Sequence, residues 1–141
     1  MALYATFLAL VGIPLLALNI DVARVYVNRA RLRSATQAAC QAYGTMLDYK
    51  HFRDSDRWRF DSTAMSTANR IFYGSVPSGG SVSISATQKS SSDPNQHIYV
   101  VGCRGRLIVS PIMWVGVSYY NLTQYVQVKV KFATSDNWVS D

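Results

Sequence analysis

The hydrophobic positions divide the chain into an apolar run, a one-sided helix and an alternating region. The run covers residues 2–20, its polar members are Tyr4, Thr6 and Asn19, and the first charged residue is Asp21. A helix of about 20 apolar residues matches the roughly 30 Å thickness of a membrane's hydrocarbon core. The run therefore predicts a membrane-spanning helix.

A secretory signal peptide is the competing interpretation of the apolar run. Signal peptides have basic residues before a shorter apolar stretch and a small-residue cleavage site after it. Residues 17–19, Ala-Leu-Asn, make a poor cleavage site, and the helical pattern continues past Asp21. We therefore expect the run to stay in the chain, with a kink or local unwinding at Gly12 and Pro14.

After Asp21 the apolar residues recur at steps of three, four or seven, which is the pattern of one stripe along a helix. The stripe comprises Val22, Val25, Leu32, Thr36, Ala39, Tyr43 and Met46. No proline interrupts residues 15–47, so we predict one helix from residue 2 to residue 47. At 1.5 Å per residue this helix is roughly 70 Å long, and its second half must lie outside a membrane.

Polar and apolar residues alternate in the C-terminal part, which predicts β-strands at 81–87, 97–109 and 125–132. Gly102 and Gly105 suggest a bulge or bend in the second strand. The expected buried side of the first strand comprises Val82, Ile84 and Ala86. The alternation suits an antiparallel sheet with one face covered by the long helix.

Between the helix and the strands, charged and aromatic residues alternate from 48 to 61 and predict a connector rather than core. A short helix fits residues 62–72, with Asp61 or Ser62 as its N-cap. The predicted fold class is α+β, a long N-terminal helix packed on a small antiparallel β-sheet. Its parts are residues 1–47 (2–20 apolar, 21–47 amphipathic), the connector with its short helix at 48–80, and the sheet at 81–141.

Composition narrows the classes of function. The 141 residues suffice for one domain, the net charge is +6, and all eight acidic residues are aspartates. His51 and His97 have no neighbours at metal-ligand spacing. The segment 102–106 has two glycines and two arginines, but it lies inside a strand rather than before a helix, so a phosphate cradle is disfavoured. We expect neither an enzyme nor a cofactor.

The two cysteines bear on whether the C-terminal part of the chain lies in an oxidising or a reducing compartment. Cys40 lies beside the apolar stripe of the helix and Cys103 lies in the central strand, so a disulfide would join helix to sheet. Disulfides persist in oxidising compartments, whereas two buried free thiols are the alternative. The basic residues after the apolar run favour a cytoplasmic C-terminal part, and we weigh the cysteines more heavily and expect export.

A motif spans the start of the amphipathic half: an Asp-x-x-Arg sequence, an aliphatic-aromatic pair, a basic cluster and a Leu-x-x-Ala-x-x-Ala-Ala stretch. Its positions are Asp21, Arg24, Val25, Tyr26, Arg29, Arg31, Leu32, Ala35, Ala38 and Ala39, and Ala64, Ala68 and Asn69 add a later Ala-x-x-x-Ala-Asn piece. The chain resembles the TadE/TadG family of pilin-like proteins from tight-adherence, type IV pilus-like systems. One position departs from type IV pilins, because residues 4–7 lack their usual glutamate and no carboxylate precedes Asp21.

The resemblance implies a major or minor structural subunit of an extracellular filament used in cell adhesion. Before assembly it implies an anchor in the inner membrane, a prepilin-type peptidase and a pilus assembly machinery as partners. In the helical homo-oligomer the filament core would comprise Leu3, Phe7, Leu8, Val11, Pro14, Leu15 and Leu18. The expected polar contacts between subunits are Asp21, Arg24, Arg29, Arg31 and Arg33.

Two alternatives stay open. One is a membrane-anchored exported domain that binds a partner and never polymerises. The other is a DNA-capturing minor pilin, because a connector with Arg53, Arg57, Trp58 and Arg59 interleaves cations with an aromatic ring. Aspartates within the same connector cancel most of its positive field, so nucleic acid is the disfavoured partner.

Overall fold

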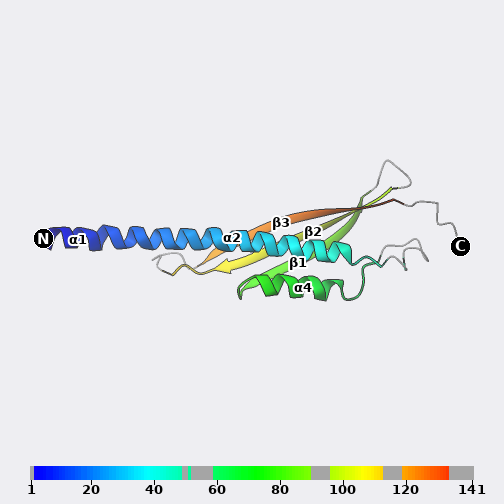
Figure 1. Cartoon of the computed structure of the whole chain (residues 1–141), viewed down its shortest axis with the longest axis horizontal. Coiled ribbons are helices and arrows are strands. Elements are labelled where there is room, and N and C mark those ends of the chain that lie inside the picture. Colours follow the sequence, from blue (N-terminus) through cyan, green and yellow to red (C-terminus); the bar gives the residue numbers. More distant parts are fainter. Residues whose placement is uncertain (1, 49–50, 52–58, 90–95, 113–118, 134–141) are drawn as a thin grey trace.

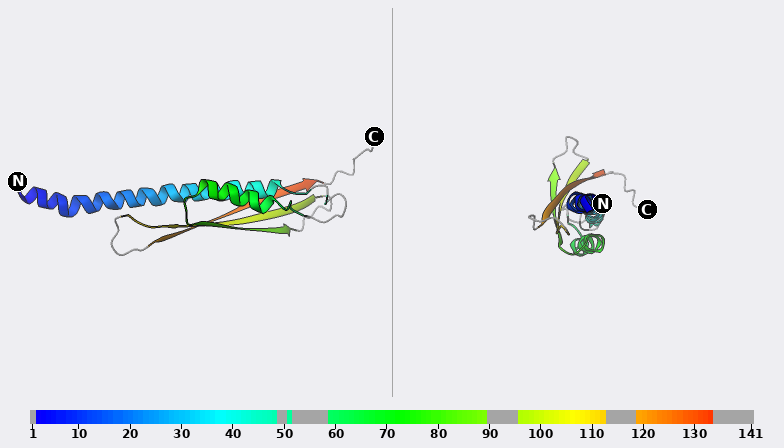
Figure 2. Two further views of the ribbon diagram at one scale, coloured as in Figure 1. Left: turned by 90° about the horizontal axis from the view of Figure 1, so that it is seen from below. Right: turned by 90° about the vertical axis from the view of Figure 1, so that its left-hand side faces the viewer.

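A computed structural model describes residues 2–48, 51, 59–89, 96–112 and 119–133 of the chain. In this part, a long N-terminal helix runs along one face of a three-stranded antiparallel sheet and projects far beyond it (Figure 1). A shorter helix, α4 (Ala64–Ser75), lies beside it on the same face of the sheet (Figure 2). The arrangement confirms the predicted α+β layout of a long helix and a small antiparallel sheet.

The long helix is continuous through three segments, α1 (Ala2–Phe7), the π-helical turn η1 (Leu8–Gly12) and α2 (Ile13–Thr45). The π turn lies where local unwinding was expected. Pro14 has no N–H to donate to the carbonyl of Leu10, and a π turn shifts the backbone pairing by one residue. The helix therefore widens before the proline instead of breaking there.

The helix ends two residues before the predicted end. The backbone of Met46 leaves the helical region (φ −92°, ψ 44°), and its N–H donates to the carbonyl of Tyr43. Leu47 then pairs with Phe60 in an isolated antiparallel bridge. Phe60 was assigned to a connector rather than the core, but it is half-buried: its ring centroid lies 4.5 Å from that of Tyr43, and both rings pack against the buried cluster around Cys40.

The sheet has the order β1-β2-β3, with β1 at Gly80–Lys89, β2 at Gln96–Val109 and β3 at Tyr120–Ala133. The register of β2 with both neighbours is unbroken from end to end, so the bulge expected at its glycines is absent from the described strands. Gly105 instead lets α2 approach the sheet closely. A Cβ atom there would overlap the hydroxyl of Thr36 and lie 3.1 Å from Cδ1 of Leu32.

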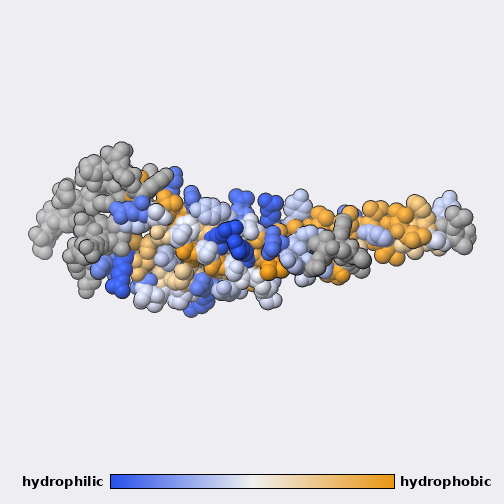
Figure 3. All heavy atoms as spheres, turned by 180° about the vertical axis from the view of Figure 1, so that it is seen from behind, coloured by the Kyte–Doolittle hydropathy of each residue, from blue (hydrophilic) through white to orange (hydrophobic). Residues whose placement is uncertain are grey.

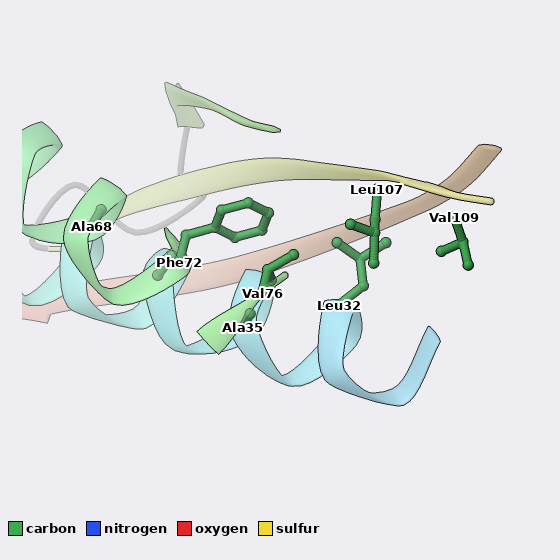
Figure 4. Close-up of a cluster of buried hydrophobic side chains, with 8 residues drawn as sticks. Leu32, Ala35, Ala68, Phe72, Val76, Leu107 and Val109 are labelled. Atoms are coloured by element: carbon green, nitrogen blue, oxygen red, sulfur yellow. The ribbon is translucent and has the colours of Figure 1, made fainter. Parts of the chain in front are cut away.

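The core lies between the two helices and the inner face of β2. One buried cluster contains Leu32, Ala35 and Ala39 of α2, Ala68, Phe72 and Val76 from α4 and its end, and Leu107 and Val109 of β2 (Figure 4). Fully burying a side chain such as Phe72 or Leu32 stabilises the fold by about 1.5–3 kcal/mol. A second cluster, centred on Cys40, Val101 and Cys103, continues the core towards the end of α2.

The apolar stripe of α2 is confirmed at its centre and wrong at its beginning. Leu32, Thr36 and Ala39 are fully buried, whereas Val22 is 44% exposed and its neighbour Asp21 is buried. The cause is local, because the chain leaving β2 passes over the Asp21 side of the helix and hydrogen-bonds it at Ile112.

The short helix, α4, covers Ala64–Ser75, so it begins two residues later and ends three residues later than predicted. Neither Asp61 nor Ser62 is its N-cap, because the residue at that position is Thr63. The Asp61 carboxylate accepts hydrogen bonds from the backbone N–H and the hydroxyl of Thr63, which holds a turn before the helix. Ala64, Ala68 and Phe72 are buried, while Ala86 on the edge strand β1 is exposed, against expectation.

Candidate functional site

The largest group of exposed apolar side chains on the described chain lies on the part of the long helix that projects beyond the sheet. Tyr4 is 79% exposed, Leu8 66% and Leu10 70%, and most of the face of the projection seen in Figure 3 is hydrophobic. A contiguous apolar surface of this kind marks a contact with a membrane or with another protein. Within the described chain, one helix is long and apolar enough to cross a membrane, and only 6% of its most apolar window is buried.

The residues predicted for the membrane or filament core lie on this projection. Phe7, Leu8, Val11, Pro14, Leu15 and Leu18 are all exposed. Leu3 lies in α1, and its side chain is outside the described part. The projection thus presents apolar side chains around the helix rather than along one stripe, which suits immersion in lipid or in a bundle of helices.

The projection meets the sheet at a buried carboxylate. Asp21 is 3% exposed, and its Oδ1 accepts a hydrogen bond of 3.0 Å from the backbone N–H of Ile112. We expected Asp21 on the surface, in contact with a neighbouring subunit. The structure places it inside its own chain, where it fixes the segment after β2 to the base of the projection.

The four arginines expected at subunit contacts line two grooves on different sides of α2. Arg24 and Arg31 line a groove of about 650 Å³ whose opposite wall is the end of β2. Arg29 and Arg33 line a second groove, of about 690 Å³. Among the described residues, none of these arginines has a hydrogen-bonding or ion-pair partner. Four guanidinium groups next to the apolar projection are therefore available to an external partner.

The predicted disulfide is present. Cys40 of α2 and Cys103 of β2 are bonded, with their Cα atoms 5.8 Å apart and the two residues 63 positions apart in the sequence. Both residues are fully buried. The bond fastens the last part of the long helix to the central strand.

The basic connector is placed only in part. Arg53, Arg57 and Trp58 lie outside the described residues. Arg59 is exposed, and its backbone carbonyl accepts a hydrogen bond of 2.9 Å from the N–H of Asp48. The geometry of this segment therefore supplies no argument for nucleic-acid binding.

The outer face of the sheet is positively charged, which was not predicted from the sequence. Arg104, Arg106 and Lys129 are exposed on the face opposite the helices, and no strand contains an acidic residue. Tyr125 is 57% exposed there, and its hydroxyl oxygen lies 2.8 Å from the position that a Cβ atom on Gly102 would take, so a side chain at that glycine would displace the tyrosine hydroxyl. The sequence did contain an indication of this face, because the basic residues of the strands occupy the polar positions of the alternating polar and apolar pattern.

The described residues contain no group of three His, Cys, Asp or Glu side chains that could hold a metal ion. The segment 102–106, considered above as a phosphate cradle, is uninterrupted strand. Burial raises the pKa of the Tyr99 hydroxyl, which donates a 3.1 Å hydrogen bond to Gln88. The hydrogen bond between Tyr99 and Gln88 joins β2 to β1, so these two side chains contribute to strand pairing.

Comparisons with protein-family models, with curated proteins and with solved structures give no match to this chain.

Proposed function

We propose that this chain is a structural subunit of an extracellular, TadE/TadG-like pilus filament, held in a membrane by its apolar projection before assembly. The observation that carries the proposal is the projection itself, in which the residues from Tyr4 to Leu10 are exposed although most are apolar. In lipid these side chains are covered by acyl chains. Outside lipid they need other apolar helices, and copies of the same helix supply them.

The disulfide supports export of the sheet. A bond of this kind persists in an oxidising compartment and is rare in the cytosol. The sheet would therefore lie on the outer side of the membrane, although the arginines after the apolar run oppose that orientation. A filament subunit must present its sheet on this side, since assembly takes place there.

Head-to-tail contacts between identical subunits produce an open helical polymer when the rotation does not close. The projection lies at one end of the molecule, and the sheet follows it along the axis (Figure 2). Both grooves are lined by the part of α2 that follows the projection. A projection buried among neighbouring projections would place the arginines of one copy near the polar groups of the next. Arg29 and Arg33, both exposed, are the best placed for such contacts.

The first test is electron microscopy of material sheared from cells, with mass spectrometry of its main protein band. The proposal expects fibres composed of this chain. If the chain stays in the membrane fraction and no fibre contains it, the proposal fails.

A sharper test separates assembly from anchoring. Ala5 and Ala9 are exposed and one helical turn apart, so Ala5→Phe with Ala9→Phe keeps the projection apolar but changes its shape. Crowding at a packed helix contact costs about 1–3 kcal/mol, so we expect roughly a tenfold or greater loss of fibres with membrane insertion unchanged. The control is Ala86→Phe, the same change at an exposed position of the sheet.

The second candidate is an anchored binding domain that does not polymerise. It is favoured by one observation, the cationic outer face of the sheet with Arg104, Arg106 and Lys129. An anchor tolerates Ala5→Phe with Ala9→Phe and also tolerates replacement of residues 2–20 by an unrelated apolar helix. Partner binding would instead be lost with Arg104→Gln and Arg106→Gln.

A further inference from the structure

The groove that contains Arg24 and Arg31 lies where the apolar projection meets the sheet. We propose that this groove binds the headgroup of an anionic phospholipid of the membrane that holds the projection. The inference rests on the membrane stage of the proposed function and adds to it a lipid site at the base of the helix.

The helix geometry gives the position of the groove relative to the membrane surface. Residues 2–20 rise about 28 Å at 1.5 Å per residue, which is close to the thickness of the hydrocarbon core. Ile20, at the end of this segment, lines the groove, and Arg24 lies one turn further along. A rise of about 6 Å from Ile20 places Arg24 at the level of the lipid phosphates.

A second, independent part of the chain indicates the same level. The hydrogen bond between Ile112 and Asp21 holds the segment after β2 beside the first charged residue of the helix. Ile112 is 64% exposed there, and Tyr119, directly before β3, is 57% exposed. Exposed aliphatic and tyrosine side chains are typical of protein surfaces at the membrane interface.

The walls of the groove suit a lipid headgroup. Apolar side chains of Ile20, Val27 and Val109 line it together with the polar side chains of Asn28 and Ser110. A phospholipid uses both kinds of wall, because its phosphate and headgroup hydroxyls adjoin its apolar acyl chains. A free phosphate ion would make no use of the apolar wall.

The charges of the groove are available. Arg24 and Arg31 are seven residues apart, which puts them on one face of α2 about 10 Å from each other along the axis. Neither has a hydrogen-bonding or ion-pair partner within the described chain. Arginine binds phosphate through two parallel hydrogen bonds, and no existing pair must be broken for a phosphate to bind.

The second groove provides a matched control. It is lined by Arg29 and Arg33 but also by Tyr26, Gln37 and Gln124, so it begins further from the apolar segment and has a more polar wall. Arg29→Gln with Arg33→Gln removes the same charge from the same helix as Arg24→Gln with Arg31→Gln. A general attraction between the basic helix and anionic lipid would respond equally to the two pairs.

The experiment uses the full-length protein in nanodiscs of phosphatidylcholine with a minority of phosphatidylglycerol. Native mass spectrometry gives the ratio of the two lipids retained on the protein, relative to their ratio in the disc. We expect the unaltered chain to enrich phosphatidylglycerol, and Arg24→Gln with Arg31→Gln to lower the enrichment roughly tenfold. The control pair, Arg29→Gln with Arg33→Gln, should change it less than about twofold, since its groove lies further from the lipid.

A further variant guards against loss of folding in the doubly substituted chain. Val27 lines the groove and is 51% exposed, so Val27→Trp obstructs part of the groove without changing any charge. It should lower the enrichment while the disulfide remains intact by mass. Absence of enrichment in the unaltered chain, equal effects of the two arginine pairs, or undiminished enrichment in Val27→Trp would each overturn the site. None of these results bears on fibre formation, which is measured separately in cells.

Discussion

Asp21 and Ile112, 91 positions apart in the sequence, are joined by a hydrogen bond from the Ile112 N–H to a nearly buried carboxylate oxygen at 3.0 Å. Asp21 is also the first charged residue after the apolar projection. The bond therefore ties the segment after β2 to the base of the apolar projection.

Replacing Asp21 by alanine should loosen this junction. A hydrogen bond to a charged acceptor contributes about 1.5–3 kcal/mol, so we expect Asp21→Ala to lower the free energy of unfolding in detergent by about 2 kcal/mol. In Asp21→Ala the Ile112 amide should exchange its hydrogen faster than in the unaltered chain. Asp21→Asn keeps an acceptor, so its exchange rate should lie between those of the unaltered chain and Asp21→Ala. Unchanged exchange at Ile112 in Asp21→Ala would show that the bond is not formed.

The close approach of α2 to the sheet makes Gly105 sensitive to the smallest addition. A Cβ atom there would overlap the Thr36 hydroxyl and crowd Leu32 and Phe72. We expect Gly105→Ala to destabilise the fold by about 1–3 kcal/mol, as measured by chemical denaturation. Gly74→Ala is the control, because its Cβ would meet nothing within 4 Å and the site is helical, so that change should be neutral or stabilising.

A double-mutant cycle can assign the effect of Gly105→Ala to its neighbour. The Thr36 hydroxyl donates a 2.7 Å hydrogen bond to the carbonyl of Leu32 and points towards Gly105. Thr36→Ala removes the overlapping atom, so the double variant should be less destabilised than the sum of the single changes. Strict additivity would mean that the two positions do not touch.

The disulfide should supply a large share of the stability. It closes a loop of 63 positions, for which loop-closure entropy gives about 4 kcal/mol. Reduction, or Cys40→Ala with Cys103→Ala, should lower the free energy of unfolding by about that amount. The double variant should then be insensitive to dithiothreitol, and equal stability of the oxidised and reduced chain would contradict the expectation.

The turn before α4 predicts a weak dependence of stability on pH. Hydrogen bonds from the hydroxyl and backbone N–H of Thr63 lower the pKa of Asp61. A folded pKa below the unfolded one stabilises the fold above the unfolded pKa, and this contribution is lost as the pH falls through the folded pKa. Melting curves between pH 7 and pH 3 should therefore fall less steeply for Asp61→Asn, and also for Thr63→Ala, than for the unaltered chain.

Periodicity predicted the elements of this fold well because each has one dominant pattern. The helix at Ala2–Thr45, the alternation of β3 and the pairing of Cys40 with Cys103 all follow from residue spacing and compartment chemistry. The end of the helix was placed two residues too late because the Leu47 and Phe60 bridge depends on residues far apart in the sequence. No local pattern encodes such a contact.

The site was predicted less completely, for a similar reason. Asp21 looked like a surface residue because it is charged and begins a basic stretch, but its burial is decided by the backbone of Ile112. The glycines of β2 looked like a bend because glycine is unfavourable in a strand. In the folded chain Gly105 leaves space for the Thr36 hydroxyl on one face of the sheet, and Gly102 lies against the Tyr125 hydroxyl on the other.

The continuous helix and its disulfide also determine how the molecule would carry a pulling force. Tension applied at the N-terminus passes along the backbone to Cys40 and crosses directly to Cys103, so the 63-position segment between them bears no load. Fully extended, that segment would add roughly 200 Å to each subunit. A subunit with the disulfide intact cannot release this length, whereas a reduced subunit can. The maximum extension of the chain under tension would therefore depend on whether its surroundings are oxidising or reducing.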